Sequence, residues 1–188
     1  HGLYLVYQPK ICLMTGLPIG LEALIRWRHP TRGELSPAHF IPLAEQTSLL
    51  QEITEWVIDK TIERLKRLQG QGIQLPITVN VSVRDFSHGD FADRIQAKMT
   101  KARLPMSLLG IECLETERIL ESPAAIRGLE MLKQRGFGIA LDDFALTPIQ
   151  IPATIQPMVP NTRTTGKLFS LLLRLWKAML LVNARVGM

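Results

Sequence analysis

Five side chains with oxygen donors lie within or at the ends of short apolar segments in the first 144 residues. They are Glu22, Asn80, Glu112, Asp142 and Asp143. Carboxylate and amide oxygens are the ligands that Mg²⁺, Mn²⁺ and Ca²⁺ prefer in proteins. The sequence offers no competing cluster of histidine and cysteine at metal-ligand spacing, so His29, His39 and His88 are predicted to be solvated or to cap turns. The residue types therefore predict a site for a hard divalent cation.

Some of these residues have a structural alternative when each segment is taken alone. Glu22 and Arg26 share one face of a strand, where they could hold a metal and a phosphate or form an ion pair with each other. Asn80 belongs to a polar stripe with Thr78 and Ser82, which fits a site or a buried hydrogen-bond network. Only the combination of segments favours the metal site.

The paired acids leave similar alternatives. Glu112 and Glu115 are three residues apart, so a regular strand points them to opposite faces. One can then be a ligand while the other is a surface charge or braces a loop. Asp142 and Asp143 repel each other unless a cation neutralises them, although turns also use such pairs.

Strands and helices alternate along the segments that must position these side chains. Strands are predicted at 3–9, 19–27, 75–82, 109–115 and 138–144, and helices from Pro37, over 50–68 and 90–103, and from Pro123 to Gly136. Mostly apolar strands that alternate with helices are typical of a parallel α/β sheet or a (β/α)₈ barrel, whose chemistry lies at the carboxyl ends of the strands. About five strands are recognisable, so we expect an incomplete barrel.

Composition and charge narrow the choice of partners. The chain has 188 residues, 46% hydrophobic, which is enough for one core, and Cys12 and Cys113 are predicted to be buried or incidental thiols. All 17 acidic residues precede position 145, whereas five of the 22 basic residues follow it, so the net charge of +5 belongs to the tail. The neutral body excludes a nucleic-acid polymer as the expected partner.

The combination of several motifs, in this order, resembles the EAL domain family of cyclic di-GMP phosphodiesterases. The motifs are YQPK at 7–10, EALIRW at 22–27, LSPAHFIPLAEQ at 35–46, NVS at 80–82, ECLE at 112–115 and ALDDF at 140–144. The resemblance implies a modified (β/α)₈ TIM-like barrel that hydrolyses cyclic di-GMP to linear pGpG with two Mg²⁺ or Mn²⁺ ions. It also implies a cytoplasmic location, which includes the cytoplasmic part of a membrane-anchored protein. The partners it implies are a second copy of the domain and an N-terminal GGDEF or sensor domain, and the strand-like start agrees with such a linkage.

The same resemblance assigns roles to individual residues. Glu22, Asn80, Glu112 and Asp142 correspond to ligands of the first metal. Asp142 would also bridge to the second metal, with Asp143 beside it. Glu115 corresponds to a glutamate that braces a loop near the site. Gln8 and Arg26 correspond to substrate contacts, with Arg26 toward a phosphate.

The chain departs from the family's pattern after Phe144. The family's GTGYSSL, Lys-Ile-Asp and AEGVE-like motifs have no match in 145–188, so its catalytic lysine and its later glutamate are not assigned. The family also usually has Glu-x-Thr-Glu where this chain has Glu112-Cys113-Leu114-Glu115, so Leu114 removes the hydroxyl between the two glutamates. We therefore expect an EAL domain at 1–144 with impaired turnover. The alternatives are an inactive module that binds cyclic di-GMP or a protein, and a truncated remnant.

The basic, proline-rich tail at 145–188 suits no barrel helix. A frameshift would explain it, and resequencing would test that hypothesis. Within the tail, 168–182 has the pattern of an amphipathic helix, with Ser170, Arg174 and Lys177 in one polar stripe. Its alternatives are a membrane-surface helix, a cover for the open barrel edge, or an apolar run without a role.

Overall fold

The structure is a computed structural model, and it describes residues 2–113, 119 and 121–141, which belong to one compact unit. The described residues form a six-stranded sheet whose main path runs in the order β1-β2-β4-β5-β6, with β3 beside β2. Its strands are β1 (Leu3–Ile11), β2 (Pro18–His29), β3 (Gly33–Leu35), β4 (Ile77–Val81), β5 (Leu109–Cys113) and β6 (Gly138–Leu141). The parallel pairing predicted from the sequence is confirmed for β2, β4, β5 and β6. β1 and β3 instead pair antiparallel with β2, because each joins it through a short connection.

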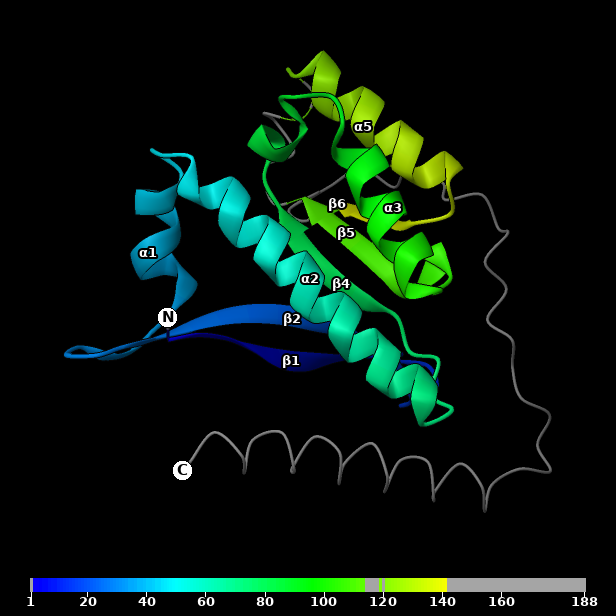
Figure 1. Ribbon diagram of the computed structural model, residues 1–188. Helices are drawn as coiled ribbons and strands as arrows, with labels where there is room; N and C mark the ends of the chain where they lie inside the picture. The colour runs from blue at the N-terminus through cyan, green and yellow to red at the C-terminus, as the bar shows by residue number, and fades with distance from the viewer. Residues whose placement is uncertain (1, 114–118, 120, 142–188) are drawn as a thin grey trace, which may run out of the picture. The chain divides into compact units, whose positions relative to one another are not determined.

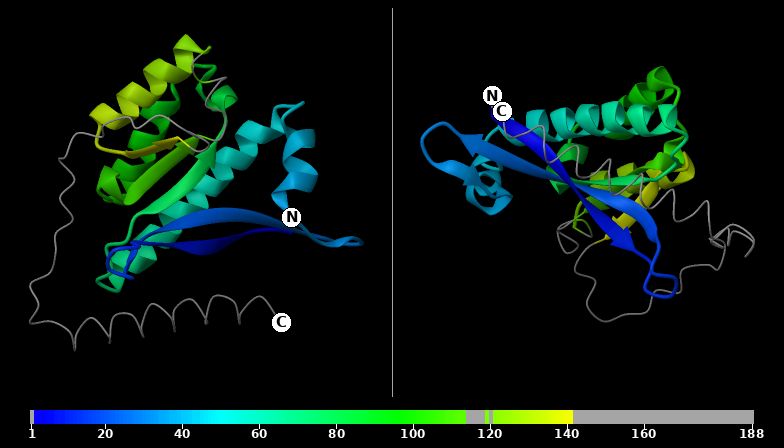
Figure 2. Two further views of the ribbon diagram at one scale, coloured as in Figure 1. Left: turned by 180° about the vertical axis from the view of Figure 1, so that it is seen from behind. Right: turned by 90° about the horizontal axis from the view of Figure 1, so that it is seen from below.

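Helices pack on one face of this sheet. They are α1 (Pro37–Ala44), α2 (Leu49–Gly70), α3 (Phe91–Ala102) and α5 (Pro123–Gln134), with the short 3₁₀ turns η1 (Val83–Phe86) and η2 (Met106–Leu108). Figure 1 shows α2, α3 and α5 in front of the strands, and the two views of Figure 2 place them on the same side. The predicted starts at Pro37 and Pro123 are confirmed. Ser122 caps α5 by accepting a hydrogen bond from the Ala125 N–H at 3.3 Å.

The core lies between the sheet and these helices. Ile77 and Val79 of β4 and Leu109 and Ile111 of β5 are completely buried. The helices supply the facing side chains, namely Ile58, Leu65, Ile95, Met99 and Leu132. Burial alternates along β4, so Thr78 and Asn80 point to the opposite, less buried face. The sheet thus keeps its apolar side under the helices and leaves its polar side for chemistry.

A tight aromatic contact joins the end of β4 to two helices. Phe86 of η1 is 1% exposed and meets Phe91 of α3 edge-on, with ring centroids 4.9 Å apart. Gly128 of α5 lies against the same ring, and a Cβ atom added there would be 2.3 Å from Phe86 Cδ1. The packing of α5 therefore depends on the absence of a side chain at this position.

Ion pairs join the outer surfaces of α2 and α3. Glu55 contacts Arg94 at 3.1 Å and Lys98 at 2.6 Å, and Lys98 also contacts Asp59 at 2.6 Å. These groups lie on the helix layer, away from the polar face of the sheet. Within the part of the chain that the structure describes, no helix is long and apolar enough to cross a membrane.

Candidate metal and ligand site

Glu22 and Asn80 meet on the polar face of the sheet. Glu22 lies on β2 and Asn80 on β4, 58 residues further along the chain. Asn80 Nδ2 donates a hydrogen bond to Glu22 Oε1 at 2.9 Å. The neighbours of Glu22 on β2, Leu21 and Ala23, are buried on the other face, as the alternation predicted. Parallel pairing of β2 with β4 therefore brings an amide and a carboxylate together.

Glu112 comes next on the neighbouring strand. Asn80 and Glu112 are register partners in the parallel pair β4–β5, and each is the fourth of five residues in its strand. Glu112 is only 9% exposed. Lys10 reaches it from β1, with Lys10 Nζ 2.5 Å from Glu112 Oε2. Three oxygen-bearing side chains thus occupy three adjacent strands, and a lysine ammonium lies against one of them.

The Asn80 amide supports the assignment of a cation site. Its Nδ2 is used by Glu22, whereas its Oδ1 is buried and has no hydrogen-bond partner. A buried acceptor without a partner costs about 1–3 kcal/mol, so such atoms usually serve a function or a missing ligand. Together with the carboxylates of Glu22 and Glu112, this oxygen forms the donor set that hard divalent cations prefer. These three residues therefore fit a metal of that class.

The remaining predicted site residues divide into two groups. Asp142, Asp143 and Glu115 lie outside the described residues. Among the residues that are described, no three histidine, cysteine or acidic side chains gather at one point. Within the described residues, the candidate cation site therefore offers two carboxylates and an amide.

Gln8 and Arg26 lie on the hairpin β1–β2. Gln8 is exposed and is the direct register partner of Glu22, so the structure brings it beside the donor set. Arg26 lies four residues beyond Glu22 on the same half-exposed face, which separates their Cα atoms by about 13 Å along a regular strand. Arg26 Nη1 donates to the Ile25 carbonyl at 2.8 Å. Among the described residues, the ion pairs do not include one between Arg26 and Glu22, so this arrangement does not bear out the ion-pair alternative.

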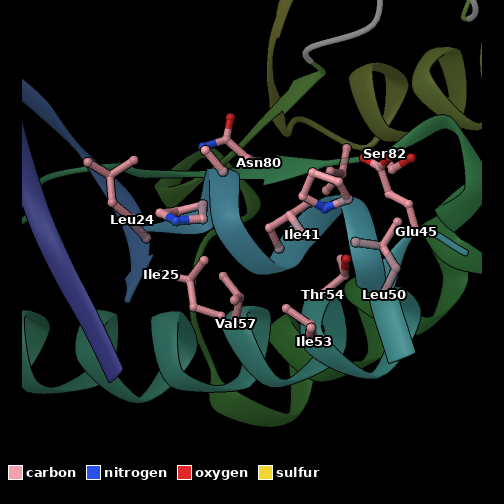
Figure 3. Close-up of a pocket in the computed structure, with 15 residues that line it drawn as sticks. Leu24, Ile25, Ile41, Glu45, Leu50, Ile53, Thr54, Val57, Asn80 and Ser82 are labelled. Atoms are coloured by element: carbon pink, nitrogen blue, oxygen red, sulfur yellow. The ribbon is translucent and has the colours of Figure 1, made fainter. Parts of the chain in front are cut away.

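A pocket beside Asn80 was not anticipated from the sequence. It has a volume of about 320 Å³ and lies between the middle of β2, the end of β4 and the helices α1 and α2. Figure 3 shows its apolar walls, formed by residues such as Ile25, Ile41, Leu50 and Val57, with Asn80, Ser82 and Glu45 also lining it. In the sequence, the apolar residues of α1 indicate only that this helix packs against the rest of the fold. They also form one wall of the pocket, because of the position of α1 against β2.

The histidine predictions can be followed at all three positions. His88 is exposed in a turn, as predicted, and His29 and His39 contact neighbouring groups. The His29 Nδ1 accepts from the backbone N–H groups of Thr31 and Arg32 at 3.2 and 3.3 Å. The His39 Nδ1 lies 2.9 Å from Ser36 Oγ. Both histidines therefore belong to turns or to a helix start, as predicted.

Asp85 is a buried acid directly after the strand that carries Asn80. It is 3% exposed, and its Oδ2 accepts from the Ser82 N–H at 2.8 Å and from Thr54 Oγ1 at 3.2 Å. Burial raises the pKa of this carboxyl to about 6, although both hydrogen bonds oppose the rise. The spacing Ser82-x-x-Asp85 is a capping-box pattern, so the sequence did contain a signal for its place.

Asp85→Asn is expected to change how stability depends on pH. The pKa of Asp85 is higher in the folded chain than the usual aspartate value of about 4, so its stabilising effect is present at low pH and is lost as pH rises through 6. Relative to the variant, the wild type should lose about 2 kcal/mol of unfolding free energy between about pH 4.5 and about pH 7.5. Urea unfolding across this range measures the difference, and parallel curves for the two proteins would contradict it.

The fold and the site together define the class of protein: an α/β domain of the (β/α)₈ barrel type, with two carboxylates and an amide on neighbouring parallel strands. The family model named EAL domain matches residues 1–154. The chain therefore belongs to the EAL domain family. Phosphodiesterases of this family are metal-dependent.

Individual relatives agree with this assignment. The chain is 38% identical over 144 residues to the cyclic di-GMP phosphodiesterase PA2567 of Pseudomonas aeruginosa, an alignment that covers 77% of this chain and 24% of the relative. It is also 38% identical over 143 residues to the bifunctional diguanylate cyclase/cyclic di-GMP phosphodiesterase MucR of the same organism, covering 76% and 21%. The solved PaMucR phosphodiesterase–c-di-GMP complex superimposes with a TM-score of 0.71 and 36% identity, over 77% of this chain and 59% of that one. The chain thus spans about a quarter of the length of these two curated relatives.

Proposed function

We propose that this chain is a cyclic di-GMP domain whose site is that of a metal-dependent phosphodiesterase, with hydrolysis to pGpG as the reaction. The observation that carries the proposal is the set Glu22, Asn80 and Glu112 on adjacent strands, with the Asn80 Oδ1 buried and without a partner. The two P. aeruginosa relatives, both named as cyclic di-GMP phosphodiesterases, support the substrate class.

In this proposal the metal is Mg²⁺ or Mn²⁺, held first by Glu22, Asn80, Glu112 and Asp142. Asp142 would bridge to a second ion with Asp143 beside it, and Glu115 would brace a loop near the site. A bound divalent cation would neutralise phosphate charge and lower the pKa of a bound water. Oxygen-only donors support Mg²⁺ or Mn²⁺ over zinc.

Gln8 and Arg26 would position the ligand. Gln8 is exposed directly beside Glu22, so its amide can donate to or accept from a ligand at the cation site. The Arg26 guanidinium lies further along β2 and suits a phosphate, which it can bind through two parallel hydrogen bonds. The apolar pocket between α1 and α2 offers a wall for a guanine base, and Glu45 at its lining can accept from the N–H groups of that base.

We also propose that turnover by this chain is impaired while binding is retained. The tail at 145–188 contains no aspartate or glutamate and no match to the family's catalytic lysine motif. Binding needs mainly the groups on β1, β2, β4 and β5, whereas hydrolysis also needs a group that activates water. An inactive binding module is the second candidate function for this reason.

The wider context is proposed on family grounds alone. We propose a cytoplasmic location, a second copy of the domain as a partner, and a GGDEF or sensor domain in the same protein. The bifunctional name of MucR supports the linkage to a cyclase domain. Size-exclusion chromatography with light scattering would test the dimer.

A thermal melt of the purified 188-residue chain tests binding first. It is run with Ca²⁺, with and without cyclic di-GMP, because Ca²⁺ is chosen to allow binding while suppressing hydrolysis. A ligand at about 100 times its Kd should add about 2.7 kcal/mol to the unfolding free energy and raise the melting temperature by several degrees. GMP serves as the control nucleotide.

The outcomes separate the two candidate functions. Saturable stabilisation followed by pGpG formation in Mn²⁺ would support the phosphodiesterase. Stabilisation without product would support the binding module. A cooperative melt that cyclic di-GMP does not move would refute both.

A further inference from the structure

Lys10 makes a contact across the sheet that the family site does not explain. Its Nζ lies 2.5 Å from Glu112 Oε2, although 102 residues separate the two in the chain. β2 and β4 lie between their strands in the sheet order. Three strand spacings amount to about 14 Å, which exceeds the combined reach of the two side chains on a flat sheet. The contact therefore requires the sheet to curl, so that β1 faces β5 over the polar face.

The burial of the pair makes this contact energetically significant. The side chain of Glu112 is 12% exposed and that of Lys10 is 34% exposed. A carboxylate removed from water needs a compensating cation, because its hydration is lost without one. The Lys10 ammonium provides that compensation at the Glu112 oxygen in the structure described. The ammonium comes from β1 and the carboxylate from β5, and two other strands lie between them in the sheet. The ion pair therefore also stabilises the curled shape of the sheet.

We propose that Lys10 is the resting counter-ion of the metal site: it occupies Glu112 in the metal-free protein and is displaced when a divalent cation binds. The inference rests on the proposed function, in which Glu112 is a metal ligand. A dication and an ammonium compete for the same carboxylate oxygen, because they repel each other at contact distance. Lys10 therefore stabilises the metal-free fold and lowers the affinity for the metal.

The long, flexible stem of lysine suits this exchange. Four carbons let the ammonium leave Glu112 without moving β1, and the neighbouring position opposite Lys10 is Gly20, which has no side chain to obstruct it. The register between β1 and β2 shifts directly after Lys10, between Lys10 and Ile11. The exchange thus needs a side-chain movement only.

Mn²⁺ binding by the full 188-residue chain tests the proposal without any measurement of activity. The variant Lys10→Met removes the ammonium and keeps an apolar stem, whereas Lys10→Arg keeps a cation. Isothermal titration with Mn²⁺ should show affinity about tenfold tighter for Lys10→Met than for the wild type. Lys10→Arg should stay close to the wild type.

Melting temperature gives an independent readout. In EDTA, Lys10→Met should melt several degrees below the wild type, since Glu112 is left without its cation. Saturating Mn²⁺ should remove this difference. Lys98→Met is the matched control, because Lys98 is similarly exposed and ion-paired, but on the helix layer with Glu55 and Asp59. Its Mn²⁺ affinity should equal that of the wild type.

Each outcome supports or overturns the inference. Equal Mn²⁺ affinity in the wild type and Lys10→Met would overturn it and leave the proposed function intact. No Mn²⁺ binding by either protein would overturn the proposed metal site, and the inference with it. Should Lys10→Met fail to fold, Lys10→Gln provides the same test, because it removes the charge but keeps a hydrogen-bond donor.

Discussion

Glu22→Gln is expected to weaken Mn²⁺ binding at least about 100-fold while leaving the metal-free melting temperature close to that of the wild type. In the wild type, Asn80 Nδ2 donates to Glu22 Oε1 at 2.9 Å. Glutamine keeps the size of the side chain and an oxygen that can accept the same hydrogen bond. It removes the negative charge that attracts a divalent cation. Stabilisation by cyclic di-GMP in Ca²⁺ should be lost with the metal. Titration calorimetry and thermal melts measure both effects.

The control for this variant is a carboxylate of the same type on the helix layer. Glu63 lies on the exposed side of α2 and pairs with Lys60 at 2.9 Å. Glu63→Gln should bind Mn²⁺ and cyclic di-GMP as the wild type does, since an exposed ion pair contributes little to the fold and nothing to the site. A Glu22→Gln protein with the same Mn²⁺ affinity as Glu63→Gln would remove Glu22 from the metal site.

Gly128→Ala should destabilise the fold by about 2–3 kcal/mol, although alanine favours a helix over glycine by about 1 kcal/mol. The new Cβ would lie 2.3 Å from Phe86 Cδ1 and 2.9 Å from Cε1. Phe86 is 1% exposed and is fixed by its edge-on contact with Phe91, so its ring has little room to move. Urea unfolding of the two proteins measures the loss.

A matched glycine and a second-site change make this prediction specific. Gly70 ends α2 with open space around its Cα, so Gly70→Ala should leave stability unchanged or raise it slightly. Phe86→Leu should reduce the cost of Gly128→Ala, which a double-mutant cycle would report as a coupling energy between the two positions. Equal costs of Gly128→Ala with and without Phe86→Leu would show that the clash with this ring is not the cause.

Local patterns in the sequence were sufficient to predict much of the fold. The alternation along β2 and β4 correctly separated the buried residues from Glu22, Thr78 and Asn80. The predicted helix 50–68 is observed as α2, Leu49–Gly70, and its buried apolar residues are Leu50, Val57, Ile58, Ile62, Leu65 and Leu68. These predictions succeed because strand and helix periodicity are properties of neighbouring residues.

What the sequence did not predict depends on contacts between distant residues. The Lys10–Glu112 pair exists only because the sheet curls, and no local pattern encodes that curvature. The sequence does not indicate a role for Gly128, because its importance comes from the close approach of α5 to the ring of Phe86. The pocket beside Asn80 likewise follows from the position of α1 over β2. The strand face that carries Glu22 and Asn80 could thus be predicted, whereas the groups that surround it could not.

The order of the strands along the chain has a consequence for how the domain folds. β1 and β2 are joined by a short turn, so Gln8 and Glu22 can meet in a hairpin on a timescale of microseconds. The contact between Glu22 and Asn80 closes a much longer loop, and the contact between Lys10 and Glu112 closes a longer loop still. Both contacts therefore cost more chain entropy to form than the hairpin does. The hairpin residues therefore can pair before β5 has been made, although a hairpin alone is only marginally stable in water. The face that carries Glu22, Asn80 and Glu112 is therefore complete only once β5 has joined the sheet, so a cation bound there would stabilise the assembled sheet rather than start its formation.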